Sequence, residues 1–391
     1  MNAEYTGAAY LSVMGSRIRI NQVKGKGIDM QKELEYYKKN AHEVFNRFDM
    51  FYGAVDKGET GNFVFRALLD SDIELYRNIK LNSYDFTDKA EIDRYVDDVI
   101  FYTEKAYEAR REVLDDTLPV ISPILGIGDY SAFVAGDIVF SEDTSWSQPV
   151  LENLEDWRNL EEVGTSVWYA RFMNICEKLM KKVQHNGIPF MRGFFSPLDL
   201  AQALRGDALY TDFYDNPDEV HRLLDFCADA TIKFAEDIMA MAEEYLVATP
   251  YGTYFMKNSI NMSEDIACMI SPEMYREFEA PYTQKVINHF GNGFLHCHSR
   301  ALYLVPELCR LKNVKNIWIA TDPNQPKPIE VLEELIEKSN NVCLSIDCDT
   351  IESVVRNIDI AKSGNVAFCI PAGSVEEANR FTDIIRKHSK I

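Results

Sequence analysis

The sequence of 391 residues is short of basic residues. Lysine and arginine together number 41, against 62 aspartates and glutamates, so the formal net charge at pH 7 is −21. A protein that binds nucleic acid needs a basic surface for the phosphates, and a strongly acidic surface repels polyanions and anionic membranes. The charge therefore excludes nucleic acid as a partner. Because 46% of the residues are hydrophobic and 12% aromatic, we expect a globular protein with a large core.

Long apolar runs are also missing. The longest, at residues 118–125 and 187–195, are much shorter than the about 20 apolar residues that span a bilayer. Residues 1–13 show neither a basic head before an apolar stretch nor a small-residue cleavage site. The eight cysteines are dispersed without a Cys-x-x-Cys pair, which argues against a disulfide framework or a zinc ribbon. We therefore expect a cytoplasmic protein without a membrane segment.

The chain has no internal repeat or low-complexity linker, but its two parts differ in pattern. Residues 1–115 are charged, and apolar positions recur at intervals of three and four in residues 30–51 and 89–113, which predicts helices. From residue 118 onward, short runs rich in valine, isoleucine and phenylalanine alternate with amphipathic stretches. This alternation is typical of buried parallel strands connected by helices. The predicted strands are residues 119–125, 189–194, 245–249, 293–298, 316–320, 342–346 and 366–370.

An α/β fold of the closed (β/α)8 (TIM-like) barrel type accounts most simply for these strands, with an eighth expected between residues 140 and 168. We predict a mostly helical N-terminal extension at residues 1–115 and the barrel at residues 116–391. A doubly wound sheet is less favoured, because Gly126-Ile-Gly128 lacks the third glycine of the dinucleotide fingerprint. In a barrel the active site lies where the strands end, and polar residues are concentrated there.

The most informative segment is Gly293-Phe-Leu-His-Cys-His-Ser-Arg300. Because side chains alternate along a strand, His296 and His298 are predicted to face one side and Cys297 the other. Two imidazoles on one side of a strand end can bind one metal ion. They can equally line the barrel and hydrogen-bond a substrate without metal, and the pattern leaves both interpretations open.

Residues at other strand ends are candidates to complete the site. Asp322 and Asp347 each follow an apolar run, where a carboxylate can ligate a metal, act as a general acid or base, or bind a cationic substrate. Asp322 can instead cap backbone amides, because Asp-Pro-Asn is also a turn sequence. Cys369 ends the last predicted strand and would suit zinc as a thiolate, although a cysteine in a buried strand is more often a small hydrophobic residue.

Three segments together resemble the uroporphyrinogen decarboxylase superfamily. The first is Phe194-Phe-Ser-Pro-Leu-Asp-Leu200 with the later helix start Asn216-Pro217. The second is Ser263-Glu-Asp265 followed by Ile270-Ser-Pro-Glu273, the most specific part of the resemblance. The third is Leu295-His-Cys-His298, which lies where methyltransferase members carry His-x-Cys. The similarity extends from residue 118 to the C-terminus, about two thirds of the chain.

The resemblance implies a distorted (β/α)8 barrel with its cleft at the carboxyl ends of the strands. In the methyltransferase branch, zinc held by one histidine and two cysteines activates a thiol, and a methylcorrinoid protein docks over the barrel mouth. Zinc keeps a thiol deprotonated near neutral pH, and the thiolate is the nucleophile. In this sequence His296 matches the family histidine, His298 replaces the first cysteine, and Cys369 lies five residues before the position of the second.

The leading hypothesis is therefore a methyltransferase with a small-molecule substrate, a corrinoid protein as partner and a metal, zinc by resemblance, at His296 and His298. Cys369 is the candidate third ligand. The candidate catalytic carboxylates are Asp322, Asp347 and Asp265, of which the first two could also complete the metal site.

Two alternatives remain open from the sequence. The decarboxylase branch of the superfamily uses no metal and holds substrate carboxylates with N-terminal arginines, for which Arg17 and Arg19 are candidates. A metal-free lyase acting on a tetrapyrrole or another carboxylated substrate is therefore the first alternative. The second is a non-catalytic barrel that binds a corrinoid or a small ligand.

Overall fold

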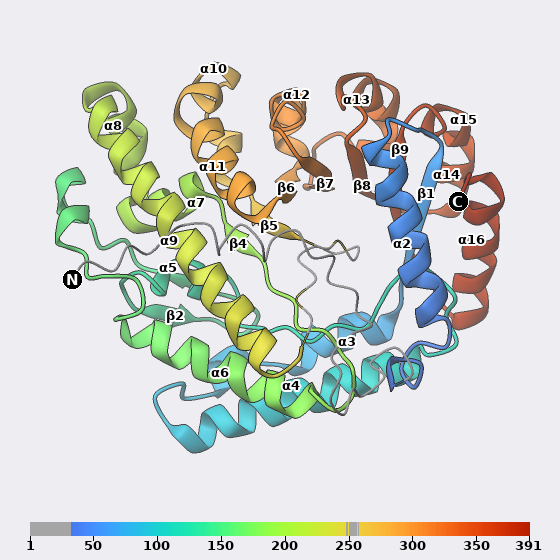
Figure 1. The fold of residues 1–391 in the computed structure, drawn as a ribbon, viewed down its shortest axis with the longest axis horizontal. Coiled ribbons are helices and arrows are strands. Elements are labelled where there is room, and N and C mark those ends of the chain that lie inside the picture. Colours follow the sequence, from blue (N-terminus) through green and yellow to red (C-terminus); the bar gives the residue numbers. More distant parts are fainter. Residues whose placement is uncertain (1–32, 248, 250–255, 257) are drawn as a thin grey trace, which may run out of the picture.

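A computed structural model describes residues 33–247, 249, 256 and 258–391. Its centre is a seven-stranded sheet in which all neighbouring strands are parallel. In spatial order the strands are β1 (Asn62–Leu68), β9 (Asn365–Pro371), β8 (Cys343–Asp347), β7 (Val314–Ala320), β6 (Asn292–His298), β5 (Ser259–Ser263) and β4 (Phe194–Phe195). Figure 1 shows them as an arc with helices along its outside. The predicted α/β class is confirmed.

Helices connect the strands and cover the sheet. They are α2 (Ala41–Asp56), α3 (Asp70–Asn78), α4 (Lys89–Ala109), α5 (Asp129–Ala132), α6 (Val167–Val183), α7 (Pro197–Arg205), α8 (Leu209–Asp215), α9 (Pro217–Glu244), α10 (Pro272–Met274), α11 (Ala280–Phe290), α12 (Val305–Leu308), α13 (Leu332–Lys338), α14 (Ile351–Arg356), α15 (Ile358–Ala361) and α16 (Val375–His388). The side chains of Ser196, Thr350 and Ser374 cap α7, α14 and α16 by accepting hydrogen bonds from backbone amides of the first turn.

Four predicted strands are confirmed. Residues 293–298, 316–320 and 366–370 lie in β6, β7 and β9, and all but the first of residues 342–346 lie in β8. Most of their side chains are buried, and burial on both faces of a parallel sheet is the reason why apolar runs identify such strands.

The strand predicted at residues 245–249 is not present in residues 245–247 and 249, which are the part of it that the structure describes. Tyr245 caps α9, and Leu246 has a φ of 56° in the left-handed region, which no strand residue adopts. The strand in this part of the sheet is β5, at residues 259–263. Its sequence, Ser-Ile-Asn-Met-Ser, contains too few apolar residues to be recognised as a buried strand.

Residues 119–125 and 189–194 form much less strand than predicted. Ile121 and Phe190 make an isolated parallel bridge, and β4 comprises only Phe194 and Phe195. Proline lacks the amide proton that a strand ladder needs, and Pro119 and Pro123 interrupt the first of these segments.

The prediction of an eighth strand between residues 140 and 168 is also wrong, because the main sheet contains no strand from this part of the chain. β2 (Ile138–Phe140) instead pairs antiparallel with β3 (Ser145–Ser147) in a separate two-stranded sheet. Further along, residues Leu154–Asn159 form a 3-10 helix.

The sequence analysis missed β1, which lies within the predicted helical extension and pairs with β9 along its whole length. Its apolar run is only Phe-Val-Phe before Arg66, and it stands between two charged helices, so periodicity did not reveal it. At least this part of residues 1–115 belongs to the sheet. The division at residue 115 itself stays a prediction.

Residues 115–121 make backbone hydrogen bonds to two separate parts of the chain. The amide of Asp116 donates to the carbonyl of Phe65 in β1 at 2.8 Å. Ile121 is hydrogen-bonded to the segment before β4. Its amide donates to the carbonyl of Pro189, and its carbonyl accepts from the amide of Met191. The segment is therefore bonded to β1 near its start and to residues 189–191 near its end, without forming a regular strand.

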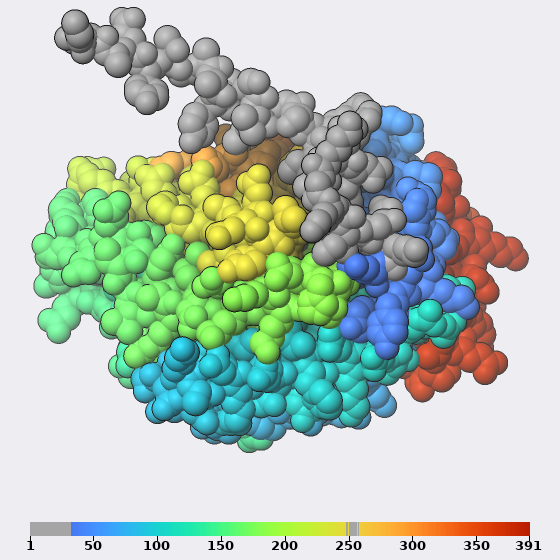
Figure 2. Space-filling model, turned by 60° about the horizontal axis from the view of Figure 1, so that its bottom comes forward, coloured from blue at the N-terminus to red at the C-terminus, as the bar shows by residue number. Residues whose placement is uncertain are grey.

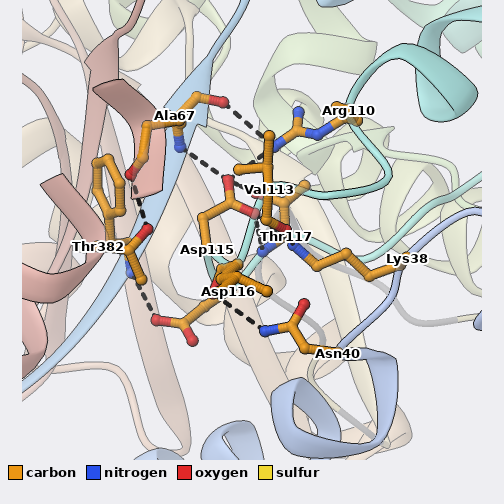
Figure 3. A network of polar contacts seen from close by, with 12 residues as sticks. Lys38, Asn40, Ala67, Arg110, Val113, Asp115, Asp116, Thr117 and Thr382 are labelled. Atoms are coloured by element: carbon orange, nitrogen blue, oxygen red, sulfur yellow. Dashed lines mark hydrogen bonds and ion pairs between the residues drawn. The ribbon is translucent and has the colours of Figure 1, made fainter. Parts of the chain in front are cut away.

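A buried network of charges fixes this segment (Figure 3). The carboxylate of Asp115 accepts hydrogen bonds from Lys38 Nζ and Arg110 Nη2, both at 2.6 Å, and from the amide of Ala67 at 2.8 Å. Lys38 and Arg110 are each only 1% exposed. A buried charge is tolerated only when it is paired and hydrogen-bonded, so these contacts fix Asp115 against β1.

Helices also cover the face of the molecule shown in Figure 2. There α4 packs beside α6, and α6 packs against α9. No described helix combines the length and the apolar composition that a membrane span requires.

The network gives a prediction about stability. Asp115→Asn leaves Lys38 buried without its ion-pair partner and leaves Arg110 paired with Asp72 alone. We expect a loss of about 3–5 kcal/mol in the free energy of unfolding at pH 7, measured by urea denaturation. Burial acts to raise the pKa of Asp115, but Lys38 and Arg110 lower it to about 2. Since this lies below the unfolded value of about 3.9, the stabilisation is present above pH 4 and is lost as the pH falls toward 2. The difference between wild type and variant should therefore shrink over that range.

The matched control is Glu112→Gln, which removes a carboxylate from the exposed pair with Lys39. Solvent screens that pair, so the control should change stability far less. Equal losses in both variants would contradict the assignment of Asp115 as a buried anchor.

Candidate metal-binding site

One face of the sheet is partly accessible at the carboxyl ends of the strands. There the side chains alternate between buried and partly exposed positions along β6, β7, β9 and β1. The register places Asp347 opposite Cys369, and Cys369 opposite Arg66, and residues paired in this way face the same side. We call this side the site face. Its partly exposed residues are His296, His298, Trp318, Asp347, Cys369 and Arg66.

His296 and His298 lie together on the site face, as their spacing predicts. Their side chains are 17% and 31% exposed, whereas Cys297 between them is buried. The ring centroids are 4.9 Å apart, with 64° between the ring planes. The two imidazoles therefore converge instead of splaying apart.

Asp265 brings a carboxylate to the same point. It follows β5, whose last residue Ser263 is paired in register with His296. Its Oδ1 lies 3.2 Å from Nε2 of His298 and 3.6 Å from Nε2 of His296. One ligand atom from each of these three residues lies within 4.8 Å of the others, and this is the group among the described residues that could hold a metal ion.

The distances fit the requirements of a metal centre. Ligand bonds of 2.0–2.1 Å in a tetrahedral site put neighbouring ligand atoms about 3.3 Å apart. The separations of 3.2 Å and 3.6 Å from Asp265 Oδ1 are close to that value. The same Oδ1 and the Nδ1 of His296 are buried without a well-aligned hydrogen bond. Two nitrogens and one oxygen thus converge at separations that three ligands of one metal ion would have.

Asp199 holds Asp265 in place. Its buried carboxylate accepts hydrogen bonds from Ser263 Oγ at 2.6 Å, from the amide of Asp265 at 3.1 Å and from the amide of Ile266 at 2.8 Å. These contacts fix the turn that carries Asp265. The sequence analysis did not single out Asp199 as a functional residue. Its place in the first turn of α7, directly after β4, was the available signal.

Asp322 holds His298. Its carboxylate is 6% exposed and lies 2.9 Å from Nδ1 of His298. Burial acts to raise the pKa of Asp322, but hydrogen bonds from Arg300 and His298 lower it to about 2, so the carboxylate is ionised and can only accept. Nδ1 of His298 therefore carries a hydrogen in both forms of the ring. When the ring is neutral, Nε2, the nitrogen next to Asp265, has the free lone pair. Carboxylates commonly orient metal-binding histidines in this way.

The two histidines have different environments. Burial lowers the pKa of His296, which favours the neutral form that a metal requires. Interaction with Asp265 raises the pKa of His298. A metal ion that binds here would displace a proton from His298 and take its place beside the carboxylate.

The remaining predicted residues lie further along the site face. Asp347 and Cys369 are on β8 and β9, beyond Trp318, whose ring centroid is 4.3 Å from that of His296. Burial raises the pKa of Asp347 and raises that of the Cys369 thiol to about 12, so this thiol is protonated at neutral pH. Cys369 is not part of the converging group, and the geometry favours Asp265 as the third ligand.

Arg66 is a cation on the site face that the sequence analysis missed. It stands opposite Cys369 in the register and acts to lower the pKa of both Cys369 and Asp347 against the effect of burial. The predicted arginines, Arg17 and Arg19, lie outside the described residues.

The chain is similar to known proteins in sequence and in fold. The family model of uroporphyrinogen decarboxylase (URO-D) matches residues 137–312, a stretch that contains Asp199, Asp265, His296 and His298. The chain also has the fold of a solved methyltransferase from Methanosarcina mazei, with a TM-score of 0.55 and 11% identity, over 85% of this chain and 96% of that one.

Two curated relatives are similar in sequence to part of this chain. They are methylcobamide:CoM methyltransferases MtbA, from Methanosarcina acetivorans (25% identical over 190 residues) and Methanosarcina mazei (24% over 188). Each match covers 48% of this chain and 49% of the relative, so the chain matches about half the length of these relatives. The predicted resemblance to the URO-D superfamily, nearer to its methyltransferase branch, is confirmed.

The geometry predicts which residues bind metal. Asp265→Ala should weaken zinc binding by at least about 100-fold, as should His296→Ala, because each removes a direct ligand. Cys369→Ser should leave the affinity unchanged. Competition with a chromophoric chelator measures the affinity, and melting in EDTA shows whether each variant folds. Loss of binding in Cys369→Ser with full binding in Asp265→Ala would refute the assignment.

Proposed function

We propose that the protein is a methyltransferase that exchanges a methyl group with a corrinoid protein or a thiol at a metal held by Asp265, His296 and His298. The observation that carries this proposal is the convergence of these three side chains inside the segment that matches the URO-D family. The similarity to methylcobamide:CoM methyltransferases supports methyl transfer as the reaction.

The donor set suits a divalent metal such as zinc, which would supply a Lewis acid that favours the deprotonated form of a bound thiol. The protein's own residues do the positioning. Asp322 fixes the tautomer and orientation of His298, and Asp199 fixes the turn that presents Asp265. Trp318 packs against His296 and excludes water from that side of the ring.

The surroundings of the site also suit this function. Because the site face opens at the carboxyl ends of the strands, a corrinoid protein could present its methyl group there while a small substrate occupies the free position. We also propose that residues 115–121 take the place of an eighth strand and close the barrel, supported by their bonds to both sheet edges. The eight free cysteines agree with a reducing cytoplasm as the location.

The proposal predicts that metal and activity are lost together. The wild type should bind about one zinc ion per chain and transfer a methyl group from free methylcobalamin to a thiol, followed by the change in cobalamin absorbance. His296→Ala should lower both zinc content and rate by at least about 100-fold. The matched control is His289→Ala, which removes an exposed histidine on α11 and should change neither. An unchanged rate after removal of all metal would contradict the proposal.

A second candidate function rests on Arg66. A cation beside a buried carboxyl on the site face suits a substrate carboxylate, which favours a metal-free lyase. In that case EDTA-treated protein should release CO₂ from a carboxylated substrate, and Arg66→Gln should abolish the release while His296→Ala does not. Methyl transfer by the zinc form, without CO₂ release by the metal-free form, excludes this candidate.

A further inference from the structure

A pocket lies between the 3-10 helix Leu154–Asn159 and the helices α9 and α11. Its volume is about 520 Å³, within the range of about 300–1,000 Å³ that is usual for sites that bind small molecules. Five of its lining residues belong to α9, at positions 221, 222, 225, 226 and 229. Side chains three and four residues apart share one face of a helix, so these positions form one side of the pocket. No lining residue belongs to the candidate metal-binding group, and the pocket is therefore a separate feature.

Two aromatic rings of the lining are fixed by their neighbours. Nε1 of Trp157 donates to Oε1 of Glu219 at 2.7 Å, and Glu219 is only 7% exposed. The ring centroids of Trp157 and Phe226 are 5.6 Å apart, with 36° between the ring planes. Both side chains are partly exposed, so they present aromatic surface to a ligand. Such a surface favours contact with another flat ring.

His221 and Tyr282 form another part of the lining. The hydroxyl of Tyr282 lies 2.9 Å from Nδ1 of His221. The imidazole is also stacked on Phe278, with 4.7 Å between the ring centroids. These contacts hold both side chains in one orientation. The lining is therefore ordered before a ligand arrives, which lowers the free-energy cost of binding.

Positive charge is in surplus beside Arg222, which lines the pocket. Nη1 of Arg222 and Nη2 of Arg158 each donate to Oε2 of Glu219 at 2.6 Å. Two guanidinium groups thus share one carboxylate. The Arg222 side chain is 57% exposed, and a guanidinium group has five N–H donors, so donors remain for an anion from solution.

Negative charge is in surplus further along α9. Nζ of Lys285 lies 2.7 Å from Oδ1 of Asp225 and 2.7 Å from Oδ1 of Asp229, so one ammonium group is shared by two carboxylates. Both aspartates line the pocket and are exposed. Arg222 and Asp225 are three residues apart, a spacing that separates Cβ atoms on a helix by about 5–6 Å. A cationic and an anionic binding group therefore lie side by side, next to aromatic rings.

We propose that this pocket binds a free α-amino acid with an aromatic side chain. Arg222 receives the α-carboxylate, and Asp225 and Asp229 receive the α-ammonium group. The aromatic ring packs against Trp157 and Phe226. An aromatic amino acid matches all three features, because its opposite charges are adjacent and its ring extends from the carbon atom between them. A ligand with a single charge leaves one surplus unmatched. The site is independent of the metal and of the methyl transfer proposed above.

The test is calorimetric titration of the full chain with four probes. These are L-phenylalanine, 3-phenylpropionate (carboxylate and ring), phenethylamine (ammonium and ring) and glycine (both charges without a ring). L-Phenylalanine should bind at least about tenfold more tightly than each of the others, because each of them lacks one of the three contacts and a hydrogen bond to a charged group is worth on the order of tenfold in affinity. The affinity should be the same in the presence of EDTA.

Two substitutions of exposed residues separate the two charges. Arg222→Gln leaves Arg158 and Glu219 as a balanced pair, so the affinity for L-phenylalanine and 3-phenylpropionate should fall about tenfold while that for phenethylamine does not. Asp225→Asn leaves Lys285 with one carboxylate, so the affinity for L-phenylalanine and phenethylamine should fall while that for 3-phenylpropionate does not. Thermal melting shows whether each variant folds.

The matched controls are Arg380→Gln and Asp359→Asn, which each remove one partner of an exposed ion pair outside the pocket and should change no affinity. N-Acetyl-L-phenylalaninamide, which has the ring and neither charge, tests whether the pocket instead receives an aromatic side chain of another protein. If it binds as tightly as L-phenylalanine, the proposal is overturned. The proposal also fails if the wild type does not bind L-phenylalanine at millimolar concentration, or if both variants weaken all probes equally.

Discussion

The candidate site depends on the in-register parallel pairing of β5, β6 and β7. His296 is paired with Ser263 on one side and with Trp318 on the other, and this fixes both the height and the face of its ring. Because side chains alternate with a period of two, a shift of β6 by one residue would move both histidines to the opposite face and bring Cys297 to the site. The convergence of three donors, two from strand β6 and one from the connection after β5, is thus a consequence of sheet register.

Two buried carboxylates hold the side chains and turns whose position the sheet register sets only approximately. Asp199 and Asp322 are 2% and 6% exposed, and each accepts at least three hydrogen bonds from the segment that it holds. Burying a carboxylate is costly unless its oxygens are satisfied, so both groups fit one arrangement of their neighbours only. The donor atoms of Asp265 and His298 are therefore held in place before any ligand arrives, which reduces the reorganisation that binding requires.

The sequence predicts those features of the site that follow from the order of polar and apolar residues within a single strand. Alternation along residues 293–298 was sufficient to place His296 and His298 on one side, and buried apolar runs identified β6 to β9. Local pattern could not identify β1 and β5, because their inward-facing Arg66, Asn261 and Ser263 interrupt the apolar run. The roles of Asp265 and Asp199 depend on contacts between separate connections, which no spacing in the sequence records. Cys369 was a reasonable third ligand by resemblance, but its strand lies three places from β6 in the sheet.

The donor set has a chemical consequence for the proposed function. By resemblance, a member of the methyltransferase branch holds zinc with one histidine and two thiolates, which together neutralise the charge of a divalent ion. In the proposed site, two neutral imidazoles and one carboxylate would leave a bound divalent ion with a net charge of +1, so the ion would attract electrons from a fourth ligand more strongly. Such a site lowers the pKa of a bound nucleophile further but makes it a weaker donor, since nucleophilicity falls with basicity.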